Sequence, residues 1–213
     1  MPHSRPHPHP AGDLKPENIL IKSYSRADVK VIDFGSSCLI TDRVSTYVCS
    51  RSYRAPEIIL GLAYGPKIDV WSLGCILAEQ LSGNVLFAND SVQTILARMQ
   101  AVLGGFPAAM LVDGPDVPKY FTAERSGRVF ERIAGSGVDD AVDDGLVAIL
   151  SPGRTSLATV LGVDPDESAA AAGFLDFLTA LLQIDPARRP TAREALEHPW
   201  LALPLEFEPY ALP

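Results

Sequence analysis

Residues 13–35 read DLKPENILIKSYSRADVKVIDFG. Within this stretch, segments 18–22 and 28–34 are short and β-prone, and segment 23–27 between them has the composition of a turn. The pattern predicts a small hairpin that presents its ends to one site. Residues 35–57 show no sustained hydrophobic period and predict a long loop, a feature that is usually functional inside a compact chain.

Three motifs follow one another in order: Asp13 opens DLKPEN, Asp33 opens DFG, and Glu57 closes APE. Each short motif occurs by chance, but the ordered set with its spacing is a strong signal. On these residues the sequence resembles the eukaryotic protein kinases. The alternative is an unrelated fold in which Asp13 caps a turn and Asp33 ends a strand. The resemblance implies a mainly α fold, namely a kinase-like C-terminal lobe with a few short β-strands at its start and the N-terminal lobe absent.

The resemblance also implies a role for each polar residue of these motifs. Phosphoryl transfer relies mostly on positioning and on charge neutralisation. Asp13 matches the carboxylate that accepts or orients the substrate hydroxyl proton, and Lys15 matches the cation beside the transferred phosphoryl group. Asn18 and Asp33 match the ligands of Mg²⁺, which prefers hard oxygen donors. The implied cofactors are therefore ATP and Mg²⁺.

The nucleotide site is completed by residues of the predicted hairpin. By resemblance, Leu20 and Ile32 form the floor beneath the adenine, and Glu17 lies near the ribose. Asn18 and Asp33 meet ATP through the metal. Apolar strand residues beside polar metal ligands suit a flat base next to phosphates.

Three further matches are structural. Glu57 and Arg189 match the family's buried ion pair, which ties the end of the activation segment to the late helices. Asp69 matches the residue that opens the central helix and holds the backbone of the catalytic loop. Alternatively, Asp69 is simply a partner of the helix dipole in the first turn, and both interpretations can hold together.

Residues 33–61 read DFGSSCLITDRVSTYVCSRSYRAPEIILG. This segment is similar to the dual-specificity tyrosine-regulated kinases and to their neighbours, the homeodomain-interacting protein kinases. In these families a loop tyrosine is autophosphorylated and two arginines grip its phosphate, as arginine forks can. Tyr47 matches the tyrosine, and Arg51 and Arg54 match the arginines. Ser45 stands where the first family often has a second tyrosine. The alternative for Tyr47 is an aromatic that only packs in the loop.

Helical patterns dominate the rest of the chain. Residues 68–81 are apolar nearly all round, which predicts a buried central helix with Gly83 just beyond its end. Asp90 or Ser91 can cap the next helix, which Gly104 stops. Further predictions are one helix face built from Phe174, Phe177, Leu178, Leu181 and Leu182, a capping box of Thr191 with Glu194, and an end at His198-Pro199.

Residues 106–165 are rich in Gly, Pro and Asp and predict an insert rather than a second core. Strand-like pieces occur at 129–133 and 146–150, and residues 119–122 (KYFT) fall where the wider kinase group carries its insert. The Gly- and Asp-rich run 136–145 departs from that group's pattern and is interpreted as a solvated loop. The predicted domains are a disordered Pro/His tract (1–12), a partial kinase domain (13–203) and a tail (204–213).

The stretch before the catalytic motif departs from the family. Only twelve residues precede Asp13, and they contain neither G-x-G-x-x-G nor Val-Ala-x-Lys. Ala11 replaces the family's histidine, and Gly12 stands where this subfamily tends to carry cysteine. We therefore expect a C-terminal lobe whose beginning was lost or replaced, by splicing or truncated gene prediction. Each missing phosphate contact costs about 3–4 kcal/mol, so the chain alone should be nearly inactive and should expose apolar surface.

The composition limits the partners. The chain has 213 residues, a length that suits one large domain or two small ones. Hydrophobic residues make up 47% of it. Its net charge of −8 disfavours non-specific binding to nucleic acid or to an anionic membrane. No run of eighteen apolar residues and no secretory signal occurs. Three cysteines without metal-ligand spacing indicate reduced thiols in a cytoplasmic or nuclear protein, or alternatively one disulfide plus a free thiol.

The sequence leaves three functions open. The first is a Ser/Thr protein kinase that acts on protein substrates and autophosphorylates a tyrosine. The second is an inactive lobe that docks substrates or regulators. The third is a non-functional fragment of splicing or gene prediction. The sequence does not indicate an oligomer.

Overall fold

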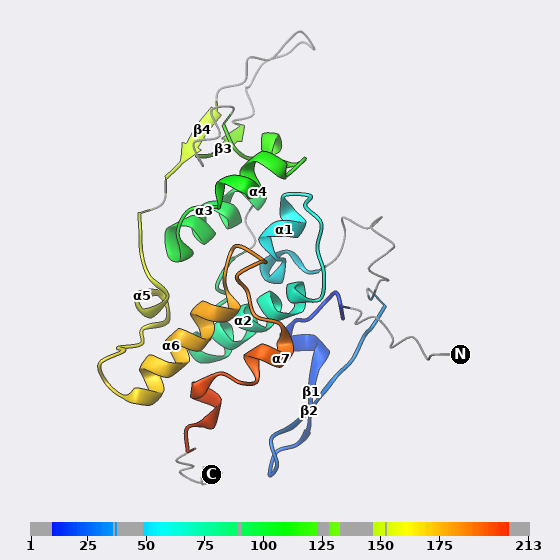
Figure 1. Ribbon diagram of the computed structural model, residues 1–213, viewed down its shortest axis with the longest axis vertical. Coiled ribbons are helices and arrows are strands. Elements are labelled where there is room, and N and C mark those ends of the chain that lie inside the picture. Colours follow the sequence, from blue (N-terminus) through cyan, green and yellow to red (C-terminus); the bar gives the residue numbers. More distant parts are fainter. Residues whose placement is uncertain are drawn as a thin grey trace.

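The computed structural model describes residues 10–35, 37, 49–88, 91–122, 128–132, 147–151 and 153–204. The predictions for the Pro/His tract at 1–9, for Tyr47 and for the tail at 205–213 lie outside these residues. Figure 1 shows helices α1 to α7 gathered in one body, from which the hairpin β1–β2 projects. The elements are η1 (Pro16–Asn18), β1 (Ile19–Ser23), β2 (Asp28–Val31), η2 (Arg51–Tyr53), α1 (Pro56–Ile59), α2 (Lys67–Ser82), α3 (Val92–Leu103), α4 (Ala108–Asp113), η3 (Val117–Lys119), β3 (Val129–Arg132), β4 (Val147–Leu150), α5 (Leu157–Leu161), α6 (Ala169–Leu181), α7 (Ala192–Ala195) and η4 (Pro199–Ala202).

The predicted hairpin forms, with bounds that differ from the sequence pattern. Strands β1 and β2 are antiparallel, with Ile19 opposite Val31. Asn18 closes the 3₁₀ turn η1 instead of opening the strand, because the proline at Pro16 starts that turn. Asp33 lies two residues beyond β2 and adopts a positive φ of 59°, which no strand residue has. Both polar residues therefore lie on the open end of the hairpin rather than within its strands.

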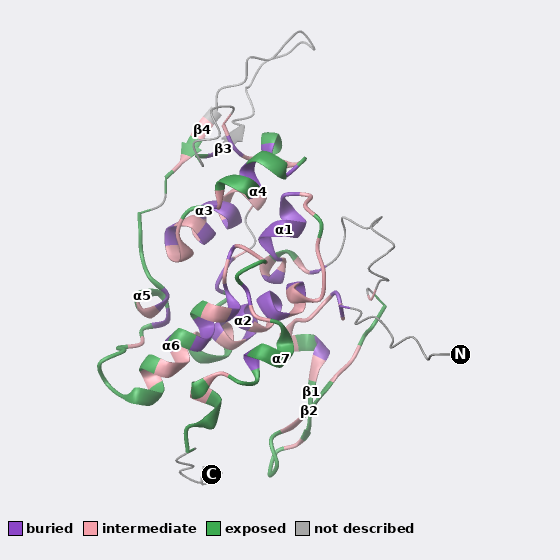
Figure 2. Cartoon of the chain, viewed as in Figure 1, coloured by how far each residue is buried: buried purple, intermediate pink, exposed green. Residues whose placement is uncertain are grey.

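Helix α2 is the centre of the body, as the apolar run predicted. Trp71, Ile68 and Ala78 have no exposed surface, and Figure 2 shows buried residues concentrated on this helix and its neighbours. Gly74 lets α6 approach, since a Cβ there would lie 2.9 Å from the side chain of Leu182. The helix ends where Gly83 turns with a φ of 70°, a conformation that favours glycine.

Local signals fix the ends of the later helices. Ser91 caps α3, and its side chain accepts a hydrogen bond from the Thr94 N–H at 3.1 Å, whereas the other predicted cap, Asp90, lies outside the described residues. The predicted capping box at the start of α7 is present: Glu194 N–H donates to the Thr191 hydroxyl, and the Glu194 carboxylate accepts from the Thr191 N–H. These short-range contacts satisfy helix-end donors that would otherwise be unpaired.

The described residues of the 106–165 segment pack on the main core, and the interpretation of this segment as an insert stays a prediction. Phe106 and Phe121 meet edge to face with ring centroids 5.3 Å apart, and both belong to the cluster that contains Trp71. The strand-like pieces pair as β3 and β4. The sequence pattern missed helices α4 and α5 in this segment, and it missed α1 and the turn η2 at the end of the predicted loop.

No described helix has the length and apolar character needed to cross a membrane.

Candidate active site

The Asp13 carboxylate is hydrogen-bonded to both Lys15 and Ser50. Its Oδ2 accepts a hydrogen bond from Lys15 Nζ at 2.7 Å, and its Oδ1 accepts from the Ser50 N–H at 2.8 Å and from the Ser50 hydroxyl at 3.0 Å. Lys15 Nζ also donates to the Ser50 oxygen at 3.3 Å. Asp13, Lys15 and Ser50 thus form a closed triangle in which the cation and the carboxylate are both fixed.

The charges in this triangle support each other. Burial by itself would raise the pKa of Asp13, but the hydrogen bonds from Lys15 and Ser50 outweigh it, so that the pKa is lowered. The same contact raises the pKa of Lys15. Because an acid with a lowered pKa and a base with a raised pKa stay charged, the site holds an ionised carboxylate beside an ammonium group at neutral pH.

Asn18 and Asp33 both lie at the open end of the hairpin. The side-chain amide of Asn18 donates to the backbone carbonyl of Asp13 at 2.9 Å. The backbone carbonyl of Asn18 accepts from the Ile32 N–H at 2.9 Å. Asp33 is the residue that follows Ile32, the partner of Asn18 in this second bond. One Asp33 oxygen accepts from the Gly35 N–H at 3.1 Å, which orients the carboxylate.

These two residues fit a Mg²⁺ site in part. With its amide nitrogen committed to Asp13, Asn18 keeps its side-chain oxygen as an acceptor, and Asp33 adds a carboxylate. Among the described residues no group of three or more His, Cys, Asp or Glu side chains could hold a metal. A magnesium ion bound here would need further oxygen ligands, which phosphate groups or water can supply.

Asp69 holds the backbone before Asp13, as the resemblance predicted. Its carboxylate accepts from the Ala11 N–H at 2.6 Å and from the Gly12 N–H at 3.1 Å. Burial raises the pKa of Asp69, and the two N–H groups partly offset this effect. Gly12 has a φ of 82°, so the glycine that departs from the family pattern occupies a position where a side chain would be strained.

The segment that carries Ser50 is held by contacts that the sequence did not reveal. Cys49, the residue before it, is buried and has a φ of 71°, which is strained for a residue with a side chain. Its carbonyl accepts two hydrogen bonds from Arg54, at 3.2 Å from Nε and 2.7 Å from Nη2. The Tyr53 hydroxyl donates to Glu79 on α2 at 2.6 Å.

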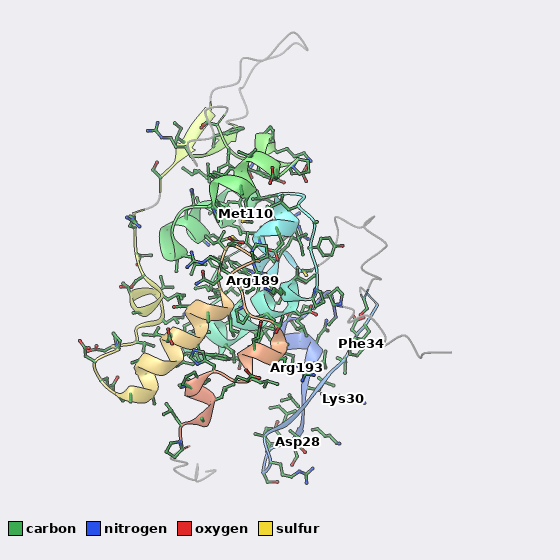
Figure 3. All side chains as sticks on the ribbon, in the orientation of Figure 1. Asp28, Lys30, Phe34, Met110, Arg189 and Arg193 are labelled. Atoms are coloured by element: carbon green, nitrogen blue, oxygen red, sulfur yellow. The ribbon has the colours of Figure 1, made fainter. Side chains whose placement is uncertain are left out.

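The predicted ion pair between Glu57 and Arg189 forms. The two guanidinium nitrogens of Arg189 donate to the two Glu57 oxygens at 2.7 and 2.9 Å, and both residues are only 1% exposed. The contact joins α1 to the loop before α7. Figure 3 shows Arg189 in the middle of the helical body.

The residues predicted to line a nucleotide site lie on the hairpin and in the turn just before it. Because Leu20 is opposite Lys30, Leu20 and Ile32 share a face, as an adenine floor requires. Leu20 is exposed, as is Glu17 in the turn before the strand. Ile21, Tyr24, Val29 and Phe34 are also exposed, so that the hairpin presents apolar surface to solvent.

Of the residues predicted to form the phosphate site, the structure describes Arg51 and Arg54. Arg51 is exposed, whereas Arg54 is half-buried with two of its donors on Cys49. Both line a cavity of about 580 Å³ that also contains Asp13 and Ser50. Their expected partner, Tyr47, is outside the described residues.

Ser50 is the site residue that the motifs missed. It lies 37 positions after Asp13, and only the fold places the two side by side.

Comparison with known proteins finds a matching family profile and several relatives. The profile of the protein kinase domain matches residues 9–201. Dual specificity tyrosine-phosphorylation-regulated kinase 3 of Rattus norvegicus is 42% identical over 197 residues, which cover 89% of this chain and 32% of that protein. Dual specificity tyrosine-phosphorylation-regulated kinase mbk-2 of Caenorhabditis elegans is 40% identical, and the match covers 23% of that protein. Serine/threonine-protein kinase ppk5 of Schizosaccharomyces pombe is 39% identical, with 20% covered. The chain thus spans between a fifth and a third of these relatives.

Proposed function

Because the chain belongs to the protein kinase family, we propose that it carries the catalytic loop for ATP-dependent phosphorylation of serine or threonine in protein substrates. The triangle of Asp13, Lys15 and Ser50 is the observation that supports this function best. An ionised carboxylate that is fixed beside a cation can take a proton from a hydroxyl while the cation offsets developing charge.

Each group has a defined part in the proposed reaction. Asp13 orients the substrate hydroxyl and accepts its proton, and Lys15 stabilises negative charge on the transferred phosphoryl group. Ser50 holds both side chains in place. Asn18 and Asp33 would hold Mg²⁺, which supplies charge neutralisation at the phosphates when it is bound.

The test is transfer of labelled phosphate from ATP to a serine peptide, with and without a magnesium chelator. We propose that residues 13–203 supply one lobe of a kinase domain, because they hold the DLKPEN, DFG and APE motifs but no glycine-rich loop or strand lysine. Transfer is therefore expected from a form that also carries such a lobe, and not from these residues alone. If the chain is instead an inactive docking module, both forms will bind peptide and neither will transfer phosphate.

We propose further that the substrate carries proline after the target residue. The Cys49 carbonyl lies next to Ser50 and is already occupied by Arg54. A substrate backbone that passes along residues 49–50 therefore finds no acceptor there for an N–H group. An unsatisfied N–H costs about 1–3 kcal/mol, and proline has no N–H to lose.

Peptides that differ only by proline or alanine after the target serine test this specificity. Proline is expected to bind roughly tenfold more tightly, because about 1.4 kcal/mol corresponds to a factor of ten. Arg54→Ala frees the Cys49 carbonyl and should largely remove the preference. Arg51→Ala is the matched control, since the bonds to that carbonyl come from Arg54. An Arg54 variant with an unchanged preference would refute the explanation.

We also propose that Tyr47 is phosphorylated in the active form and that Arg51 and Arg54 bind its phosphate. A phosphate adds about −1.5 to −2 charge, which suits two arginines that line one cavity. In a form that transfers phosphate, mass spectrometry should find the modification at Tyr47, and Tyr47→Phe should lower the rate. Tyr24→Phe is the control, because this tyrosine is exposed on the hairpin turn. Full activity without phosphate at Tyr47 would leave it a packing residue.

A further inference from the structure

The cavity that contains Asp13 has a far wall that the kinase motifs do not form. Asp116, Lys119 and Tyr120, from the segment between α4 and β3, line it together with Asp13 and Ser50. The Asp116 N–H donates to the Leu60 carbonyl just beyond α1 at 3.1 Å, which fixes this wall to the core. The cavity therefore runs from the catalytic triangle past α1 to the turn η3.

The charges of this far wall are available to a ligand. Lys119 Nζ lies 2.6 Å from Asp116 Oδ1, while the Lys119 side chain stays 64% exposed. An ammonium group has three donors, so two remain after this contact. The lining holds Arg51, Arg54 and Lys119 against Asp13 and Asp116. Asp13 is already bonded to Lys15 and Ser50, so the lining favours an incoming anion.

We propose that Lys119 is a specificity-determining residue that binds a carboxylate side chain of the peptide substrate, with Asp116 as its positioning residue. This inference rests on the proposed kinase function, because it takes the cavity as the substrate groove. In the binding mode proposed above, the target serine lies at Asp13 and the following residue lies along Cys49 and Ser50. Lys119 lies beyond α1, so the bound carboxylate belongs to a residue further toward the C-terminus of the peptide.

Peptide binding to the chain itself tests the proposal without requiring catalysis. Two fluorescent peptides are compared by anisotropy at low salt, one with Ser-Pro-Asp-Asp and one with the uncharged Ser-Pro-Asn-Asn. The acidic peptide is expected to bind about two- to fivefold more tightly, the range for an exposed ion pair, and added salt should reduce the ratio. Lys119→Glu should invert the order, and a peptide with Ser-Pro-Lys-Lys should then bind best.

Lys30→Glu is the matched control, because this exposed lysine on β2 makes the same change of net charge away from the cavity. It should leave the ratio unchanged. Equal ratios in the Lys119 and Lys30 variants, or no discrimination by the unmodified chain, would overturn the assignment. Discrimination that vanishes in Arg51→Ala but survives in Lys119→Glu would overturn it too. A chain that discriminates but never transfers phosphate, even with a second lobe, would refute the kinase proposal alone.

Discussion

Replacing Arg189 with methionine is expected to lower the free energy of unfolding by about 3–5 kcal/mol, the cost of leaving a buried charge without its partner. Arg189 donates to both Glu57 oxygens and also to the carbonyls of Gln183 and Lys67, at 3.0 Å each. Its guanidinium carbon lies 5.1 Å from the centre of the Trp71 ring. Methionine can fill the space, but it cannot satisfy the Glu57 carboxylate or the two carbonyls.

Urea or thermal unfolding of the chain measures this effect. Arg193→Met is the matched control, because Arg193 lies exposed on α7, near the same loop, as Figure 3 shows. The double variant Glu57→Gln/Arg189→Met removes both charges and should recover part of the loss. If Arg189→Met costs no more than the Arg193 control, the ion pair does not hold α1 to the late helices.

The sequence predicted those parts of the fold whose cause is local. The α2 helix, its glycine end and the capping box at Thr191 depend on residues within a few positions of each other, so the pattern alone reveals them. The short helices α1, α4 and α5 carry too few residues for a hydrophobic period to be visible. Their helical form depends on packing against the common core, which a linear pattern does not display.

The candidate site likewise contains residues that a local motif revealed and residues that it did not. Asp13, Lys15 and Asn18 lie within one short motif, and Glu57 and Arg189 were found only through the family resemblance. Ser50 reaches Asp13 across 37 positions of the chain. Nothing near Ser50 in the sequence marks it, because its role is created by the strained turn at Cys49 and by the Arg54 bonds that hold it.

The positions of Asn18 and Asp33 show how the strand prediction went wrong at two candidate site residues. Both were expected inside or at the ends of β-strands, but Asn18 lies in the 3₁₀ turn η1, and Asp33 lies two residues beyond β2 with a positive φ. A strand residue would send its side chain to one face of the hairpin. Outside the strands, the Asn18 side-chain amide instead donates to the Asp13 backbone carbonyl, and the Asp33 carboxylate accepts from the Gly35 N–H.

Replacing Asp13 with asparagine is expected to reduce phosphate transfer by about 10²–10⁴-fold, the usual contribution of a positioned general base. Asparagine keeps the size of the side chain but cannot accept the hydroxyl proton, and it removes the charge that fixes Lys15. The assay uses a form of the protein first shown to bind ATP, so that nucleotide affinity can be measured beside the rate.

That affinity should change little, because in the proposed site the nucleotide meets Asn18 and Asp33 rather than Asp13. Asp28→Asn is the matched control: it makes the same chemical change at a partly exposed carboxylate on β2, which is paired with Arg26 at 2.8 Å and is remote from the triangle. It should retain the full rate. A second measurement separates catalysis from folding, since the Asp13 variant should still bind the Ser-Pro-Asp-Asp peptide. An Asp13→Asn protein that folds, binds ATP and turns over at the rate of the Asp28 control would show that this carboxylate is not the base.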